Sequence, residues 1–305
     1  MGETDWHPIQ IADFDSEVRF VMGTRRLVRV ICNTVYLAYP YENTKHNRLI
    51  RGKRVLVTGG SAGIGEQISY QYARLGAKVV VTARTILSCL LQVVSKCKEL
   101  SGSSEHHYIA ADMANLDETE RVIREATTLL GGLDILILNH VAPYQFGWWE
   151  GSENLTAFNT RTTIGYLSHV HLTSHALPIL RKTPGSNIVV LSSMAGIIQA
   201  DYAGVKFAQN GFFKSLRDQF SVMKEDIAVT VCFLGAITLE NVSLGGLYED
   251  LIKSTPEDTS YTIVRAAQLR LPELYHPYWF VKLGTWPVTG EIFKWVLSQY
   301  LVNLG

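Results

Sequence analysis

The sequence contains few cysteines, has no excess of charge of either sign and lacks a long uninterrupted apolar run. The cysteines are scattered, without the spacing of a metal site or of a disulfide framework, and we expect them to be free thiols: Cys32, Cys89, Cys97 and Cys232. Lysine plus arginine equals aspartate plus glutamate, at 28 each, and no basic run stands out. We therefore expect no bound metal and no nucleic-acid partner.

The N-terminal stretch carries an incomplete membrane signal. Residues 27–41 are apolar and aromatic, but Arg29 and Asn33 interrupt them, and the run is shorter than the ~20 apolar residues of a spanning helix. Arg25 and Arg26 before it resemble the start of a signal or anchor segment. An amphipathic helix that packs on the domain or lies at a membrane surface fits equally well. We expect an N-terminal extension over residues 1–48 and a folded domain over residues 49–305.

Apolar residues make up 47% of the 305 residues, and from Leu49 onward they recur in a regular pattern. Short apolar runs predict strands at 55–57, 79–81, 108–111, 135–138, 188–191 and 227–234. Longer segments between them predict helices at 87–100, 116–130, 155–180 and 202–222. This alternation predicts an α/β fold, a doubly wound parallel sheet that binds its ligand at the carboxyl ends of the strands.

The most informative motif is RVLVTGGSAGIG, which runs from Arg54 to Gly65. A buried strand is predicted to turn on glycines into a helix, whose first backbone N–H groups have no partner within the helix. Those groups and the positive end of the helix dipole form an anion site, and glycine lets a pyrophosphate approach the backbone. The alternative is an ordinary glycine-rich turn between a strand and a helix.

Polar residues follow three of the predicted strands at the same edge of the sheet. Arg84 follows the second, in VVVTAR, and no Asp or Glu lies between Thr82 and Thr85. An arginine there suits a 2′-phosphate, so the pattern favours NADP(H) over NAD(H), unless Arg84 is only a solvated surface charge. Asp112 and Asn139 follow the third and fourth strands, where either could contact the cofactor or cap a loop.

The candidate catalytic residues lie further along the chain. Ser193 ends the fifth predicted strand, and Tyr202 and Lys206 are four residues apart on a predicted helix, so they share a face. A phenol has a pKa near ~10, and a neighbouring ammonium favours the phenolate and lowers that pKa. Tyr202 could then exchange a proton with a carbonyl or alcohol oxygen that Ser193 holds. By itself, YAGVK is also compatible with ordinary helix packing.

Taken together and in this order, TGGSAGIG, LILNH, the serine pair and YxxxK resemble the short-chain dehydrogenase/reductase family. Longer segments look like its 11β-hydroxysteroid dehydrogenase type 1-like branch: YARLGAKVVVTAR, HYIAADMA, GGLDILILNH, LSHVHLTSHALPIL and KFAQNGFFKSLR. The resemblance covers about residues 36–234. It implies a single Rossmann-like domain that transfers a hydride between the nicotinamide of NADP(H) and a steroid-like alcohol or ketone.

The resemblance also implies a role for each matching residue. Catalysis would fall to Ser193, Tyr202 and Lys206, and Lys206 would hydrogen-bond the ribose as well. The cofactor-binding set would be Gly59, Ser61, Gly63, Ile64, Gly65, Arg84, Asp112, Met113, Asn139, Tyr202, Lys206 and Ile237. Within that set, Arg84 would hold the 2′-phosphate and Asn139 would lie along the nicotinamide ribose.

The chain departs from the family pattern at three places. Tyr202 lies only nine positions after Ser193; that segment can still span ~30 Å when extended, but the substrate-side loop would be reshaped. Gly165 occupies the position of a catalytic asparagine that holds a backbone bend and a water of the proton relay, and Asn159 is nearly two turns away. Leu239 replaces a threonine that reaches the cofactor. These departures favour an alternative function, a catalytically impaired dinucleotide-binding protein of the same fold. A second alternative is a reductase of non-steroid carbonyls.

Features outside the central motifs bear on location and partners. N-glycosylation sequons begin at Asn154 and Asn241, and residues 269–304 are rich in aromatics. The aromatic tail suits a lid, a dimer contact or a membrane-surface patch near the entrance for a hydrophobic substrate, with core packing as the alternative. Together with the resemblance, these features lead us to expect a homodimeric glycoprotein of the endoplasmic reticulum, in its membrane or lumen, with possible membrane contact through both terminal segments.

Overall fold

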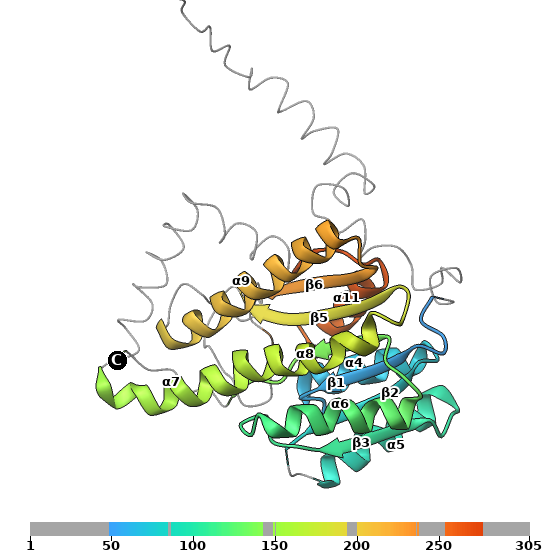
Figure 1. Cartoon of the computed structure of the whole chain (residues 1–305). Helices are drawn as coiled ribbons and strands as arrows, with labels where there is room; N and C mark the ends of the chain where they lie inside the picture. Colours follow the sequence, from blue (N-terminus) through green and yellow to red (C-terminus); the bar gives the residue numbers. More distant parts are fainter. Residues whose placement is uncertain are drawn as a thin grey trace, which may run out of the picture. The chain divides into compact units, whose positions relative to one another are not determined.

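The computed structural model describes residues 49–84, 87–142, 149, 151–193, 200–235, 237 and 254–276. These residues form one parallel sheet of seven strands in the order β3-β2-β1-β4-β5-β6-β7 (Figure 1). The strands are β1 (Arg54–Thr58), β2 (Lys78–Ala83), β3 (His106–Ala110), β4 (Ile135–Leu138), β5 (Ser186–Ser193), β6 (Ile227–Leu234) and β7 (Glu273–His276). The strand order reverses between β1 and β4, which places a binding crevice outside their carboxyl ends. The predicted doubly wound fold is confirmed.

Helices cover both faces of the sheet. The bounds are α4 (Gly63–Arg74), α5 (Leu87–Ser101), α6 (Asp117–Leu130), α7 (Leu155–Thr162), α8 (Ser168–Leu180), α9 (Ala200–Met223) and α11 (Pro256–Gln268). A 3-10 turn, η1 (Ser152–Asn154), precedes α7, and a π-helical segment, η2 (Thr163–Leu167), joins α7 to α8. Figure 1 shows α6, α8 and α9 in front of the sheet and α11 behind it. Within the described residues, no helix is long and apolar enough to cross a membrane.

The alternation of side chains along the strands divides the core into two layers. Leu56 and Leu136 point to the layer that contains Phe213 of α9, whereas Val57 and Ile137 point to the layer that contains Tyr72 of α4. All six side chains are completely buried. Burial of each aliphatic side chain is worth roughly 1.5–3 kcal/mol, so these two layers hold the strand ends at which the site forms.

The third strand and the C-terminal part of the sheet differ from the sequence-based expectation. Strand β3 begins at His106 and ends at Ala110, earlier than the predicted 108–111. Helix α11 and strand β7 were not predicted, although a capping signal is present: the Thr255 hydroxyl accepts a hydrogen bond of 3.1 Å from the Asp258 backbone N–H, and Pro256 opens the helix. The expected N-terminal extension and the sequon at Asn241 lie outside the described residues, as does the tail beyond His276.

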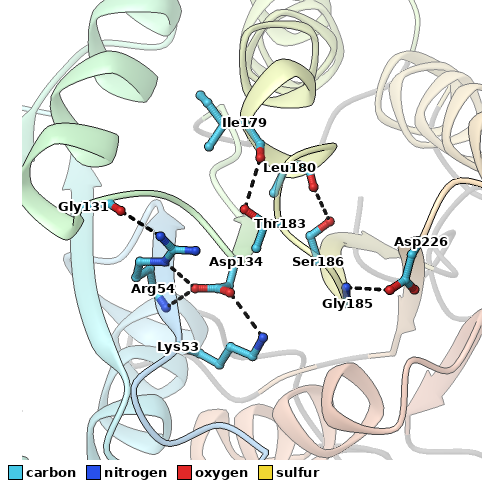
Figure 2. Close-up of polar contacts among 10 residues, drawn as sticks. All are labelled: Lys53, Arg54, Gly131, Asp134, Ile179, Leu180, Thr183, Gly185, Ser186 and Asp226. Carbon is cyan, nitrogen blue, oxygen red and sulfur yellow. Dashed lines mark hydrogen bonds and ion pairs between the residues drawn. The ribbon is translucent and has the colours of Figure 1, made fainter.

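Ion pairs join the amino ends of β1 and β4 (Figure 2). The Asp134 carboxylate accepts from Arg54 Nε at 2.6 Å, from the Arg54 backbone N–H at 2.9 Å and from Lys53 Nζ at 3.2 Å. Arg54 also donates to the Gly131 carbonyl at 2.7 Å. Burial raises the pKa of Asp134, but the hydrogen bonds from Arg54 and the charge of Lys53 outweigh it, so the net pKa lies below its ordinary value.

We predict that Asp134→Asn lowers the free energy of unfolding by about 1–2 kcal/mol at pH 7, because two cations lose a poorly exposed partner. A carboxyl whose pKa is lowered by folding stabilises the folded state above its unfolded pKa of ~3.9, and that contribution is lost as the pH falls through the folded pKa. The difference between variant and wild type should therefore shrink below about pH 4. Urea unfolding across pH measures it.

The matched control is Glu99→Gln, because Glu99 pairs with Lys96 at 2.8 Å in a well-exposed (i, i+3) pair on α5. It should change the unfolding free energy by less than about 0.5 kcal/mol at every pH. An Asp134→Asn effect that stays constant between pH 7 and pH 3 would contradict the assignment.

Candidate active site and cofactor cradle

A cradle of glycines lies between β1 and α4, where the sequence predicts a phosphate site. Gly59 and Gly63 have φ angles of +63° and +60°, a region that glycine enters readily. A Cβ on Gly59 would lie 2.7 Å from the His140 Cα, and one on Gly65 would lie 2.3 Å from the Gly59 carbonyl oxygen. Any other residue would therefore displace backbone at either position. Ser61 and Ile64 lie between these glycines, half-buried.

The start of α4 retains hydrogen-bonding capacity for an anion. Ala62 is the N-cap residue and cannot cap the helix with its own side chain. The first backbone N–H groups of the helix consequently point out of its amino end, at the positive end of the helix dipole. The cradle thus combines close access to the backbone with unpaired donors, which is the arrangement that binds phosphate groups.

Asn139 holds this cradle from the neighbouring strand. It follows β4, and its side-chain amide donates to the Thr58 carbonyl at 3.0 Å and to the Gly59 carbonyl at 2.9 Å. Its backbone N–H donates to the Thr58 hydroxyl at 3.0 Å. These contacts tie the neighbouring ends of β1 and β4 together.

Residues predicted to bind the adenosine end follow β2 and β3 at the same edge of the sheet. Arg84 follows β2 and is exposed. Asp112 follows β3, is exposed, and accepts a hydrogen bond of 3.0 Å from the Ala114 backbone N–H, so it also caps a turn. Met113 is 5% exposed and packs in the core. Ile237, a member of the predicted cofactor-binding set, forms an isolated parallel bridge with Ser254.

The three candidate catalytic residues come together in the structure. Ser193 is the last residue of β5 and Tyr202 lies in the first turn of α9; their side chains share a hydrogen bond. Lys206 is only 4% exposed, and its Nζ lies 5.7 Å from the centroid of the Tyr202 ring. The Lys206 ammonium donates to the Leu191 carbonyl of β5 at 2.9 Å. The short Ser193–Tyr202 spacing therefore does not prevent contact, and residues 194–199 between them lie outside the described residues.

The pKa values of Tyr202 and Lys206 in the structure are set mainly by burial. Burial raises the pKa of Tyr202 above 10, and the hydrogen bond with Ser193 offsets this only in part. Burial lowers the pKa of Lys206 to about 8. The pKa of Tyr202 is therefore raised, whereas the sequence argument expected Lys206 to lower it. The phenol is protonated at neutral pH, the form that can give a proton to a carbonyl oxygen.

The backbone bend near Gly165 is present without an asparagine. The π-helical segment η2 contains Gly165, and π-helical turns of this kind are frequent at functional sites. A Cβ on Gly165 would lie 2.8 Å from Cγ1 of Val205, a buried residue between Tyr202 and Lys206. Val205 thus occupies the space that a side chain at position 165 would need. Asn159 is exposed on α7 and does not take that place.

The sequence argument missed a group of buried polar residues behind the cradle: Thr58, His140, Ser168, His169 and Gln209. A signal was available, because each interrupts or borders a predominantly apolar segment. Among the described residues, no group of three or more His, Cys, Asp or Glu side chains is arranged to hold a metal ion.

This geometry defines a dinucleotide-binding α/β protein with a tyrosine, a lysine and a serine at the carboxyl edge of its sheet. A family model described as "short chain dehydrogenase" matches residues 53–243. The chain therefore belongs to the short-chain dehydrogenase family of oxidoreductases.

Curated relatives place it more narrowly within that family. It is 43% identical over 255 residues to hydroxysteroid 11-beta-dehydrogenase 1-like protein B of Xenopus laevis, covering 81% of this chain and 86% of the relative. It is 42% identical to protein A of the same species, covering 92% and 98%. The expected family and its 11β-hydroxysteroid dehydrogenase type 1-like branch are confirmed by these matches.

Solved structures agree with the fold. A short-chain dehydrogenase from Burkholderia cenocepacia, crystallised with NADP, superimposes with a TM-score of 0.66 at 22% identity and covers 74% of this chain and 96% of its own. A blue fluorescent protein from a metagenomic library, crystallised with NADPH, gives 0.65 at 22% identity, with the same coverage.

We predict that Gly165→Ala destabilises the protein by about 1 kcal/mol, although alanine ordinarily stabilises a helix relative to glycine by up to ~1 kcal/mol. The reason is the contact with Val205. In a Val205→Ala background the same substitution should become neutral or stabilising, and urea unfolding of the four proteins gives the coupling free energy.

The matched control is Gly211→Ala on α9, where an added Cβ meets nothing within 4 Å. It should stabilise the protein by about 0.5–1 kcal/mol in both backgrounds. Equal effects of Gly165→Ala with and without Val205 would contradict the packing argument.

Proposed function

We propose that the chain is an NADP(H)-dependent oxidoreductase that interconverts hydroxyl and keto groups on a steroid-like substrate, with Tyr202 as the acid/base. The observation that carries the proposal is the hydrogen bond between Ser193 and Tyr202 beside the buried Lys206, at the same sheet edge as the glycine cradle. The hydroxysteroid names of relatives at about 40% identity support the substrate class.

The residues present fit a dinucleotide. The cradle at Gly59, Gly63 and Gly65 would hold the pyrophosphate, because a Cβ would fill the space at Gly59 and Gly65. Arg84 would hold the 2′-phosphate, since its exposed guanidinium follows the strand next to β1, and solved neighbours of the same fold carry NADP or NADPH. When bound, the cofactor supplies or accepts a hydride at its nicotinamide ring.

The rest of the cofactor-binding set follows the same edge of the sheet. Asp112 and Met113 would face the adenine, and Asn139 would lie along the nicotinamide ribose. Ile237 would flank the nicotinamide ring.

The chain's own residues handle the proton. The Ser193 hydroxyl would hold the substrate oxygen, and the protonated phenol of Tyr202 would give its proton to that oxygen during carbonyl reduction. In alcohol oxidation Tyr202 takes the proton back. Lys206 sits under the phenol ring and would stabilise the phenolate that reduction leaves behind, since an ammonium nearby favours the charged form.

A second candidate function is a catalytically impaired dinucleotide-binding protein. Gly165 and the side chain of Val205 favour it, because together they leave no room for an asparagine in the proton relay. A third is a reductase of non-steroid carbonyls, which differs only in substrate. The first experiment is NADPH fluorescence on addition of protein, followed by a panel of steroid ketones and simple aryl ketones. Binding without any turnover selects the impaired protein.

We further propose that the protein is a homodimeric glycoprotein of the endoplasmic reticulum, held at the membrane by its terminal segments. Exposed apolar side chains on the described helices, Leu155 on α7 and Phe207 on α9, support a second copy as partner. Light scattering of the purified protein would have to give twice the 34.1 kDa chain mass. Fractionation with and without a glycosidase checks the compartment, and a soluble, unglycosylated monomer would refute this part.

We predict that Tyr202→Phe lowers kcat by about 10²–10⁴-fold with little change in NADPH affinity, because only the proton donor is lost. The matched control is Tyr70→Phe, since the Tyr70 hydroxyl donates to the Glu66 carboxylate at 2.8 Å within α4. The control should retain wild-type turnover. Unchanged turnover in Tyr202→Phe would refute the assigned mechanism.

We predict that Arg84→Ala weakens NADPH binding by about 10–100-fold, the size of a charge-assisted hydrogen bond to phosphate, and changes NADH binding less than two-fold. Arg124→Ala is the control, because Arg124 is an exposed arginine on α6. Titration by nucleotide fluorescence measures all three proteins. An equal loss of affinity for NADPH and NADH would show that Arg84 does not bind the 2′-phosphate.

A further inference from the structure

A continuous series of buried hydrogen bonds runs from the glycine cradle to the helix that carries Tyr202. It begins at the Thr58 hydroxyl, at the end of β1, which lies 2.8 Å from Nδ1 of His140. Nε2 of His140 lies 2.7 Å from the Ser168 hydroxyl at the start of α8. Ser168 also donates to the Ile164 carbonyl at 2.6 Å, inside the π-helical segment. This branch thus joins the cradle to the bend at Gly165.

A second branch leaves from the backbone of His140. His169 donates from Nε2 to the His140 carbonyl at 3.1 Å, and its Nδ1 lies 2.6 Å from the side-chain amide nitrogen of Gln209. Gln209 is on α9, less than one turn beyond Lys206, and is completely buried. The amide N–H must donate to Nδ1, so His169 carries its proton on Nε2, which matches its bond to the carbonyl.

Both histidines are kept neutral by their surroundings. Burial and, to a lesser extent, the charge of Lys206 lower the pKa of His140 to about 3. Burial, and then the neighbouring His140 ring and the charge of Lys206, hold the pKa of His169 well below its ordinary value. A neutral imidazole offers one donor and one acceptor, so each ring can join two different elements of the fold at once.

We propose that Thr58, His140, Ser168, His169 and Gln209 are positioning residues, a polar ladder that sets the spacing between the cofactor cradle and the Tyr202–Lys206 face of α9. The proposal rests on the proposed function, since it concerns the same reaction. The ladder joins β1, β4, η2, α8 and α9 through buried hydrogen bonds. The side chains of the ladder are buried, so removal of one polar group leaves its partners without a hydrogen bond. Unpaired buried groups favour other arrangements of these elements.

The first test separates the Ser168 hydroxyl from its volume. Ser168→Thr keeps a hydroxyl that can donate to the carbonyl four residues earlier. Ser168→Val introduces a side chain with nearly the shape of threonine but without a hydroxyl. We expect Ser168→Val to raise the Kd for NADPH roughly ten-fold relative to Ser168→Thr, because the binding-competent cradle is less populated. Ser174→Ala on the same helix is the control: its hydroxyl bonds the Val170 carbonyl at 2.8 Å, but it is exposed and outside the ladder.

The second test addresses the far end of the ladder. Gln209→Met removes the amide at similar volume, and Gln219→Met does so at an exposed position ten residues along α9. We expect Gln209→Met to lower kcat about ten-fold with an NADPH Kd within two-fold of wild type, since misplacement of a catalytic group reduces the rate more than it reduces binding. Gln219→Met should match wild type in both.

These readouts distinguish positioning from a purely structural role. A side chain that only stabilised the fold would lower the thermal midpoint and leave the Kd and kcat unchanged well below that temperature. The ladder is refuted if Ser168→Val and Ser168→Thr bind NADPH equally, or if Gln209→Met and Gln219→Met turn over equally. A wild-type protein that binds NADPH without turnover would overturn the proposed reaction instead, and the Ser168 pair would still decide whether the ladder positions the cradle.

Discussion

The site depends on the close approach of two loops that leave the sheet from adjacent strands. The loop after β1 passes so near the loop after β4 that a single methyl group on Gly59 would strike the His140 backbone at 2.7 Å. Asn139 bonds the carbonyls of Thr58 and Gly59 across this contact. Because glycine alone allows that approach, the cradle, the strand ends and the start of α4 have one mutual arrangement. Everything that binds or reacts at this edge is placed relative to it.

Burial controls the chemistry of the basic groups behind this edge. Lys206, His140 and His169 are all buried, and the charge of Lys206 lowers the pKa of both histidines. Neutral imidazoles can donate on one nitrogen and accept on the other, so the histidines link elements of the fold instead of carrying charge. The remaining cation of the group is Lys206, which lies beside the phenol ring of Tyr202. The site thus keeps its charge next to the proton donor.

The π-helical segment between α7 and α8 forms around Gly165. The π-helical segment forms with a glycine at its centre, and the Ser168 hydroxyl takes up the carbonyl of Ile164 within it. Val205 fills the space beside Gly165. The bend and the packing of α9 are therefore coupled, and a side chain at position 165 would press on the residue between Tyr202 and Lys206.

Local patterns in the sequence were sufficient for most of the fold. Apolar runs predicted β4 and β6 with their observed bounds, because a strand buried on both faces is apolar throughout. The glycine turn and the Tyr202–Lys206 spacing are also local, and they placed the cradle and the candidate acid/base on the correct elements. Helix α11 and strand β7 were missed although Thr255 and Pro256 mark the start of the helix.

The sequence by itself determined the doubly wound sheet, the family and the residue types available for a hydride-transfer site, since each depends on short-range periodicity and spacing. Only the tertiary structure decided which buried polar groups meet. Thr58 and His140 are 82 positions apart, and His169 and Gln209 are 40 apart. The physical reason is that a hydrogen bond between distant residues depends on how helices pack against the sheet. The order of residues along the chain does not encode that packing in any local pattern.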